Sequence, residues 1–375
     1  MKLKIPLFYK THSSSGNGKF PELFDFVFDF DANNSLPYQK SSKELKNMLS
    51  EIYLSGSMMT GSMNEYDLVG MQHANYAVEL ILNSYKDLNQ KKVLEIGCGN
   101  GYIIKKMLER GAICTGLEPG VQAESLSFDD LRVVNDFFPT KEIKDEKFDL
   151  ILHFNVLEHI ESPASMMSEI SEILEPDGIV IFGVPNCESF LKNGDPSIFL
   201  HEHFNYFTIE SLQHILNEAG LHLINAELGS SDAMLFITAS KNDVPKPFSI
   251  DYRFSPESFL KKNEVLKENL VTILEQFPHG KIAAYSPNRA LNLLSVLGVN
   301  DVRIIDDTPF MHNQYYPFFN KPVENFEDAV NNPPELIIIF SVTHGEKILR
   351  KCHENINLRR TRIILLSDLY CKDKS

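Results

Sequence analysis

The stretch VLEIGCGNGY, residues 93–102, decides the fold. Its first four residues form an apolar run around one acid, Glu95, and the next positions place Gly97, Gly99 and Gly101 at G-x-G-x-G spacing. The helical apolar spacing of YIIKKMLERG follows directly, and Gly111 ends it as a glycine just past a helix usually does. The pattern predicts a buried strand, a tight loop and a helix.

Such a loop brings backbone N–H groups close to a ligand, because glycine has no Cβ to block the approach. Loops of this kind also serve nicotinamide, flavin and sugar-nucleotide enzymes, and some are tight turns without a ligand. The G-x-G-x-G spacing favours a compact zwitterionic ligand over a dinucleotide pyrophosphate. Glu118 closes the next strand, where an acid accepts hydrogen bonds from both ribose hydroxyls. The alternative is a solvated acid at a strand end.

Further apolar runs alternate with helical patterns along the chain. This alternation predicts right-handed crossovers and a largely parallel sheet in an α/β fold. We expect a helix over PASMMSEISEILEPDG (163–178), ended by a Pro-Asp-Gly turn. The expected strands are AICTGLEP (112–119), LRVVNDFF (131–138), FDLILHFNV (148–156) and GIVIFGVPN (178–186).

The chain is long enough for more than one core, and we expect three parts. Residues 1–74, in which the phenylalanines of FPELFDFVFDF alternate with acids, are expected to form an irregular cap. Residues 75–240 form the glycine-loop domain. Residues 241–375 begin with the polar linker KNDVPKPFS and continue as a second, smaller α/β domain.

Composition excludes several classes of partner. The formal net charge of −15 argues against a broad nucleic-acid or anionic-membrane surface, since both require basic fields. No apolar run is long enough to span a bilayer, and the N-terminus lacks a long apolar core of a signal peptide. Five scattered cysteines without a CxxC pair indicate reduced thiols. We therefore expect a cytoplasmic protein with a small-molecule substrate.

The motifs VLEIGCGNG, TGLEPG, NDFF and FDLILHFNVLEHIESP occur in an order that resembles the class I S-adenosylmethionine-dependent methyltransferases over residues 75–240. The resemblance implies S-adenosylmethionine as cofactor and a Rossmann-like core. It places the glycine loop at the methionine end of the cofactor, Glu118 at its ribose and Asn155 in the floor of the cofactor site. Phe137 would pack on the adenine or belong to the core. The implied cofactor contacts are Glu95, Gly97, Gly99, Gly101, Glu118, Asp136, Phe137 and Asn155.

The segment LHEHFNYF, residues 200–207, holds the densest titratable cluster. We predict His203 as a general base, with Glu202 and Tyr206 assisting catalysis and His201 contacting substrate. A metal bound by the His-x-His pair is disfavoured, because no third ligand has the spacing of an HExxH motif. The segment could instead tie the sheet to the next helix. His159 lies near the cofactor carboxyl in many relatives, or acts as a cap.

The whole chain resembles the nucleotide-sugar C-methyltransferases, through KIAAYSPNRALNLLSVLG (281–298) and IIDDTPFMHNQYYP (304–317). The resemblance implies that the C-terminal domain closes over a sugar nucleotide, with Ser286, Asn288 and Arg289 at a phosphate. The alternative there is a helix cap with a surface arginine. Two features depart from the family. Its members usually begin with a four-cysteine zinc-binding module, but no cysteine precedes Cys98 here. Leu200 also stands where the family commonly has a tyrosine, two positions before the Glu-His pair. We therefore expect no bound metal.

The sequence thus leads to three functional hypotheses. The first is methylation of a keto-deoxysugar nucleotide at carbon. The second is O-methylation of a surface-polysaccharide sugar, which requires a base but no enolate stabiliser. The third is a non-catalytic scaffold that binds a sugar nucleotide, which the intact glycine loop and Glu118 disfavour.

Overall fold

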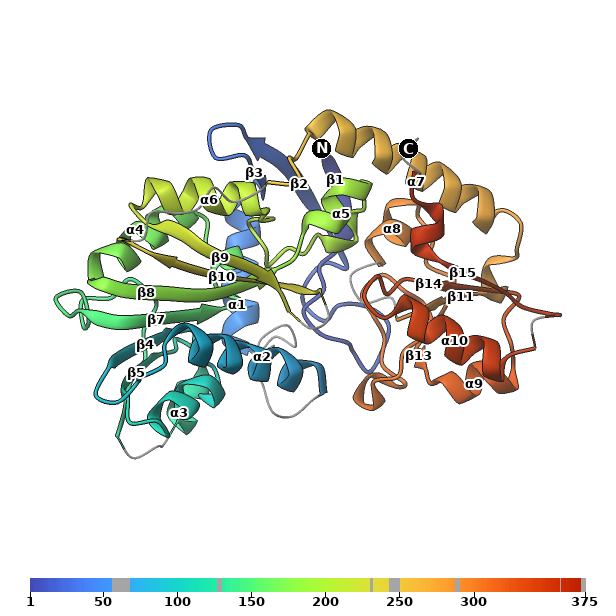
Figure 1. Ribbon diagram of the computed structural model, residues 1–375. Helices are drawn as coiled ribbons and strands as arrows, with labels where there is room; N and C mark the ends of the chain where they lie inside the picture. The colour runs from blue at the N-terminus through green and yellow to red at the C-terminus, as the bar shows by residue number, and fades with distance from the viewer. Residues whose placement is uncertain are drawn as a thin grey trace.

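The computed structural model describes residues 1–55, 68–126, 130–229, 232–242, 250–286, 291–357 and 359–371. Three sheets organise these residues: a three-stranded sheet near the N-terminus, a seven-stranded sheet, and a five-stranded sheet. Figure 1 shows the seven-stranded and five-stranded sheets on opposite sides of the molecule, with the N-terminal strands above and between them.

The seven-stranded sheet has the strand order β6-β5-β4-β7-β8-β10-β9. Strands β4 to β8 run parallel, and β10 pairs antiparallel with both β8 and β9. The predicted strands and helices of this region are present, but the helix expected over 163–178 ends at Ile173 and the β9–β10 hairpin was not predicted. The bounds are α2 (Leu68–Ser84), β4 (Lys92–Ile96), α3 (Tyr102–Leu108), β5 (Ile113–Leu117), β6 (Leu131–Val134), β7 (Phe148–Phe154), α4 (Pro163–Ile173), β8 (Leu174–Pro185), α5 (Glu188–Asn193), α6 (Ile209–Glu218), β9 (His222–Leu228) and β10 (Met234–Ser240).

Helices cover both faces of this sheet, as expected for a Rossmann-like core (Figure 1). Apolar side chains of α4 and α6 pack with one face, and those of α2 and α3 pack with the other. The predicted Pro-Asp-Gly turn is wrong, because Pro176–Gly178 lie inside β8. The pairing with β7 shifts there: Phe148 faces Leu174, whereas Leu150 faces Ile179. The extra residues therefore bulge out of a continuing strand.

The N-terminal region is more regular than the sequence prediction allowed. Strands β1 (Lys2–Pro6), β2 (Leu23–Asp31) and β3 (Leu36–Gln39) form an antiparallel sheet, followed by α1 (Lys43–Ser55). The alternating Phe and Asp residues of FDFVFDF place Phe26 and Phe28 on the buried face of β2. That period of two is typical of a half-buried strand, and the expectation of irregular structure was wrong.

The C-terminal region has its own parallel sheet with the order β13-β12-β11-β14-β15. Separate apolar clusters fill its two faces, so it has the core of its own that the alternation predicted. The division of the chain at residues 74 and 240 stays a proposal, and most of the expected linker lies outside the described residues. The bounds are α7 (Pro256–Leu274), β11 (Ile282–Tyr285), α8 (Leu291–Val296), β12 (Arg303–Ile305), β13 (Val323–Glu324), α9 (Phe326–Asn331), β14 (Leu336–Ile339), α10 (Gly345–Asn355) and β15 (Arg362–Leu365).

Among the helices of the described residues, none combines the length and the apolar character that a membrane crossing requires.

Candidate cofactor site and active site

The strand order of the seven-stranded sheet places the candidate site. The order reverses at β4, which pairs with β5 on one side and β7 on the other. In open parallel sheets, ligands bind beyond the carboxyl ends of the strands at such a switch point. The glycine loop leaves β4 there, and Asn155 follows β7 at the same edge.

The glycine loop takes a backbone shape that side chains disfavour. Gly97, Gly99 and Gly101 have φ values of +70°, +54° and +77°. A Cβ on Gly97 would lie 2.7 Å from Cγ2 of Val156, in the loop after β7. A Cβ on Gly99 would have no atom within 4 Å. Gly97 is therefore required for packing between the two loops, whereas Gly99 leaves open space of the kind a ligand can occupy.

Glu118 links the loop after β4 to the end of β5. Its carboxylate accepts a 2.9 Å hydrogen bond from the Gly99 N–H and a 2.7 Å bond from the Gly120 N–H. The side chain is buried, but a carboxylate has about four lone-pair sites, so it retains the capacity to accept from ribose hydroxyls. The alternative of a solvated strand-end acid is wrong.

Glu95 lies buried in β4, beneath the glycine loop. Its Oε2 atom has no hydrogen-bond partner within the described part of the chain. Burial, with a smaller contribution from the nearby Glu118 charge, raises the pKa of this carboxyl to about 8, although a backbone hydrogen bond from Ile104 opposes the shift. A cation placed beside Glu95, such as an amino acid ammonium, would favour its ionised form.

Asp136 and Phe137 follow β6 at the same edge. The Phe137 side chain is 64% exposed, so the alternative that it belongs to the core is wrong. The hydrogen bond from Thr140 and the Phe137 N–H lower the pKa of Asp136. An exposed ring next to an ionised carboxylate fits an adenine, whose face stacks and whose amino group donates.

Asn155 has a φ of +52°, unusual for a residue with a side chain. Its N–H donates to the Gly183 carbonyl at 2.9 Å, and its side-chain amide contacts Met234 Sδ at 3.8 Å. Strained backbone of this kind often occurs at ligand sites. The positive φ of Asn155 changes the direction of the chain directly after β7.

The catalytic candidates lie against this loop. Glu158 accepts backbone hydrogen bonds at its carbonyl from Phe204, at 2.7 Å, and from Asn205, at 3.2 Å. The His159 Nδ1 lies 2.8 Å from the Glu202 carbonyl, and the His159 and His203 rings meet edge to face with centroids 4.9 Å apart. The segment with His203 therefore contacts the loop after β7 directly.

One ligand atom each from Glu158, His159 and His203 lies within 4.8 Å of the other two. The spacing of an HExxH motif does not predict this group, because its members come from two separate segments, LEH (157–159) and HEH (201–203). The expectation of no bound metal stays a prediction.

The other predicted residues of the 200–207 segment have different surroundings. Tyr206 is fully buried, and its hydroxyl contacts the Leu200 and His203 carbonyls at 3.1 and 3.2 Å. His201 is also buried, with Nε2 3.4 Å from the Ile5 carbonyl, and burial lowers its pKa to about 4. These contacts fit structural roles better than the predicted contacts with substrate.

The predicted phosphate site falls only partly within the described residues. Ser286 follows β11 with a φ of +48°, and its N–H donates to the Ile305 carbonyl at 2.8 Å. Asn288 and Arg289 lie outside the described residues.

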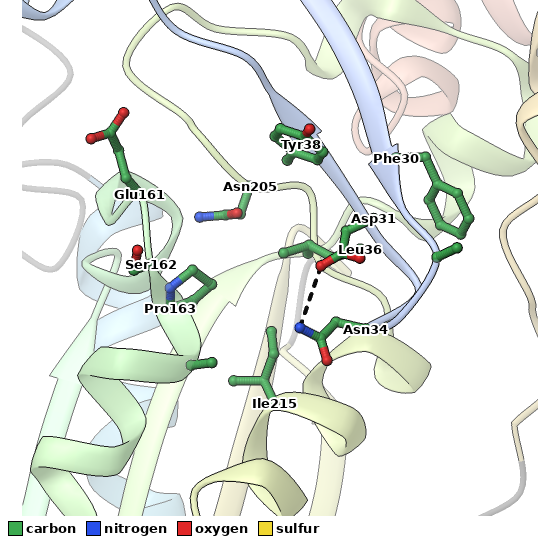
Figure 2. Close-up of a pocket in the computed structure, with 12 residues that line it drawn as sticks. Phe30, Asp31, Asn34, Leu36, Tyr38, Glu161, Ser162, Pro163, Asn205 and Ile215 are labelled. Carbon is green, nitrogen blue, oxygen red and sulfur yellow. Dashed lines mark hydrogen bonds between the residues drawn. The ribbon is translucent and has the colours of Figure 1, made fainter.

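A cavity of about 440 Å³ lies elsewhere, between the β2–β3 hairpin and the start of α4 (Figure 2). Asp31, Tyr38, Glu161 and Asn205 contribute polar groups to its lining. None of the glycine-loop residues lines it, so we do not assign it to the cofactor.

Comparisons with known proteins agree with this geometry. A family model described as "Methyltransferase domain" matches residues 71–226. The ubiquinone biosynthesis O-methyltransferase of Histophilus somni (strain 2336) is 30% identical over 121 residues, which cover 29% of this chain and 51% of that protein. The enzyme of the same name from Glaesserella parasuis serovar 5 (strain SH0165) is 34% identical over 108 residues, which cover 26% of this chain and 46% of that protein. The chain thus spans about half the length of the curated relatives it matches.

Among solved structures, the 1,6-didemethyltoxoflavin-N1-methyltransferase of Burkholderia thailandensis, with bound S-adenosylhomocysteine, is similar at 17% identity. The TM-score is 0.42, and the match covers 58% of this chain and 99% of that one. The Synechocystis magnesium protoporphyrin IX methyltransferase with bound S-adenosylmethionine has a TM-score of 0.40 at 13% identity, covering 53% and 98%. The family model thus describes residues 71–226, which include the glycine loop and Glu118, as a methyltransferase domain.

Proposed function

We propose that this chain transfers a methyl group from S-adenosylmethionine to a carbon beside the ketone of a keto-deoxysugar nucleotide, with His203 as the general base. The observation that carries the proposal is the contact between the His203 segment and the loop after β7. In this proposal His203 lies at the edge of the cofactor site, where a base for the acceptor is needed. Glu202 holds the neighbouring His159 through its carbonyl.

The residues fit the cofactor by their chemistry. Glu118 offers acceptors to the ribose, Phe137 offers a face to the adenine, and Gly99 leaves room beside the loop. When bound, S-adenosylmethionine supplies a methyl group that passes from its sulfonium sulfur to the nucleophilic carbon, leaving S-adenosylhomocysteine. The positive charge of the sulfonium is lost in this transfer, so alignment and proton removal are the chain's main tasks.

His203 takes the proton from the carbon beside the ketone, and the electron pair of that C–H bond moves into an enolate. Hydrogen-bond donors near the ketone oxygen stabilise the enolate as its charge develops. His203 keeps the proton through methyl transfer and releases it to solvent afterwards. Tyr206 holds the turn of His203 and has no contact with substrate in this scheme.

Support for a sugar nucleotide comes from the C-terminal sheet. Its order β13-β12-β11-β14-β15 has a switch point between β11 and β14, as nucleotide-binding α/β folds do. Ser286 follows β11 at that point and, with Asn288 and Arg289, remains our candidate for the phosphate contacts.

The proposal is tested by screening keto and non-keto sugar nucleotides with the protein and S-adenosylmethionine, using mass spectrometry. A gain of one CH2 by 4-keto-6-deoxy sugar nucleotides, but not by the non-keto ones, is expected. In D2O without cofactor, the wild type should also exchange the proton beside the ketone, and His203→Ala should not. Exchange by the variant at the wild-type rate would remove His203 as the base.

A second candidate is methylation of an oxygen, favoured by the names of the curated relatives, which are O-methyltransferases. It keeps the cofactor site and the base but requires no ketone. Methylation of non-keto acceptors in the same screen would favour it.

A further inference from the structure

The segment that carries His203 is held by the C-terminal region as well as by its own domain. Residues 194–199 lead into the His203 turn, and three side chains from beyond residue 250 bind them. Figure 1 shows α5, just before this segment, lying between the seven-stranded sheet and the helices α7 and α8.

Asn292 of α8 makes the central contact. Its amide nitrogen donates to the Pro196 carbonyl at 3.0 Å and to the Phe199 carbonyl at 2.7 Å, so both N–H donors are used. The side chain is 4% exposed. A buried amide with both donors satisfied fixes two carbonyls in position, because its removal takes a hydrogen bond from each of them.

Two more contacts act on the same stretch. Asn263 of α7 donates to the Gly194 carbonyl at 2.9 Å. The Tyr370 hydroxyl donates to Asp195 Oδ2 at 2.6 Å, and Asp195 Oδ1 accepts from the Ser197 N–H at 2.9 Å.

A short path of contacts joins this stretch to His203. The residue after Phe199 is Leu200, whose carbonyl accepts from the His203 N–H at 3.1 Å. The Tyr206 hydroxyl lies within hydrogen-bond distance of the Leu200 N–H and of the Leu200 and His203 carbonyls. The Phe199 ring stacks on Phe26 of the N-terminal sheet, with centroids 4.7 Å apart. The turn therefore has little freedom once Phe199 is fixed.

We propose that Asn292 is a positioning residue for His203, so that the C-terminal region shapes the active site in addition to any contact it makes with substrate. This inference rests on the proposed function of His203. Misplacing a catalytic group by about 1 Å can cost about a hundredfold in rate. We expect Asn292→Ala to lower kcat about tenfold or more, with little change in the affinity for S-adenosylhomocysteine.

A double-mutant cycle with a 4-keto-6-deoxy sugar nucleotide as acceptor tests whether Asn292 acts through His203. In the His203→Ala background, Asn292→Ala should cause no further loss of kcat. A full, independent loss there would overturn the proposal. Asn17→Ala is the matched control, because Asn17 is also buried and donates to two carbonyls, those of Leu7 and Pro21. It should lower the melting temperature comparably and keep kcat.

A second readout requires no acceptor. With 13C-labelled histidine, the ring signal that disappears in His203→Ala identifies His203. That signal should shift or broaden in Asn292→Ala and stay unchanged in Asn17→Ala. An unchanged signal in Asn292→Ala would overturn the positioning role. Full turnover by His203→Ala would instead refute the proposed base, and the ring signal would still decide whether Asn292 positions this side chain.

Discussion

The Gly99 N–H donates a 2.9 Å hydrogen bond to Oε2 of Glu118, linking the loop after β4 to the end of β5. This bond holds Glu118, the predicted ribose ligand, against the glycine loop. The same carboxylate binds the Gly120 N–H, which fixes its orientation from the other side. The glycine loop and Glu118 therefore depend on the same few backbone contacts.

Gly97→Ala should reduce both stability and cofactor affinity. The new Cβ would meet Val156 at 2.7 Å, and the φ of +70° is unfavourable for alanine. We expect a loss of about 2 kcal/mol or more in the free energy of unfolding, measured by urea denaturation. Gly220 has the same φ, and a Cβ added there would have no atom within 4 Å. Gly220→Ala therefore measures only the loss of unfolding free energy that comes from the positive φ, about 1 kcal/mol. Equal losses in the two variants would show that the Val156 contact is unimportant.

Phe137→Ala should weaken S-adenosylhomocysteine binding without unfolding the protein. A base stacked on an aromatic ring is worth about 1–3 kcal/mol, which corresponds to about tenfold or more in Kd. Calorimetry measures this loss. Phe310, which is 68% exposed, provides the matched control, since Phe310→Ala removes another exposed ring outside the site. Unchanged affinity in Phe137→Ala would argue against an adenine at this ring.

Glu95 should make stability depend on pH. Its folded pKa of about 8 lies above the ordinary value of 4.5, so the folded protein binds a proton that the unfolded chain has released. The stabilisation from this proton is intact below pH 4.5 and is lost as the pH rises to about 8, by at most about 1.4 kcal/mol per pH unit. The difference between wild type and Glu95→Gln in urea unfolding should follow this slope. A pH-independent difference would contradict the raised pKa.

Metal removal should leave activity intact. Glu158, His159 and His203 are close enough to share an ion, yet a base cannot accept a proton on a nitrogen that binds a metal. We expect dialysis against EDTA to leave methyl transfer unchanged, with metal content followed by elemental analysis. Activity lost on dialysis and restored by Zn²⁺ would assign the cluster to a metal instead.

Local patterns in the sequence predicted much of the α/β fold, and the predicted cofactor contacts stay predictions. The glycine spacing and Glu118 have fixed offsets from their strands, so topology alone brings them together. The N-terminal sheet was missed because the alternation of phenylalanines and acids in FDFVFDF was interpreted as part of an irregular cap. The surroundings of the 194–207 segment depend on contacts distant in sequence, such as the Gln39 amide donating to the His201 carbonyl. Local spacing carries no information about such contacts, and Tyr206 was therefore taken for a catalytic group.

The most direct test of the central claim uses S-adenosylmethionine labelled with 13C in its methyl group and a 4-keto-6-deoxy sugar nucleotide. NMR of the product distinguishes a methyl on carbon from a methoxy group by its chemical shift. We predict a C-methyl signal that forms at least about a hundredfold more slowly in His203→Ala, while both proteins still bind S-adenosylhomocysteine. A methoxy signal, or no labelled product from any keto sugar nucleotide, would contradict the account.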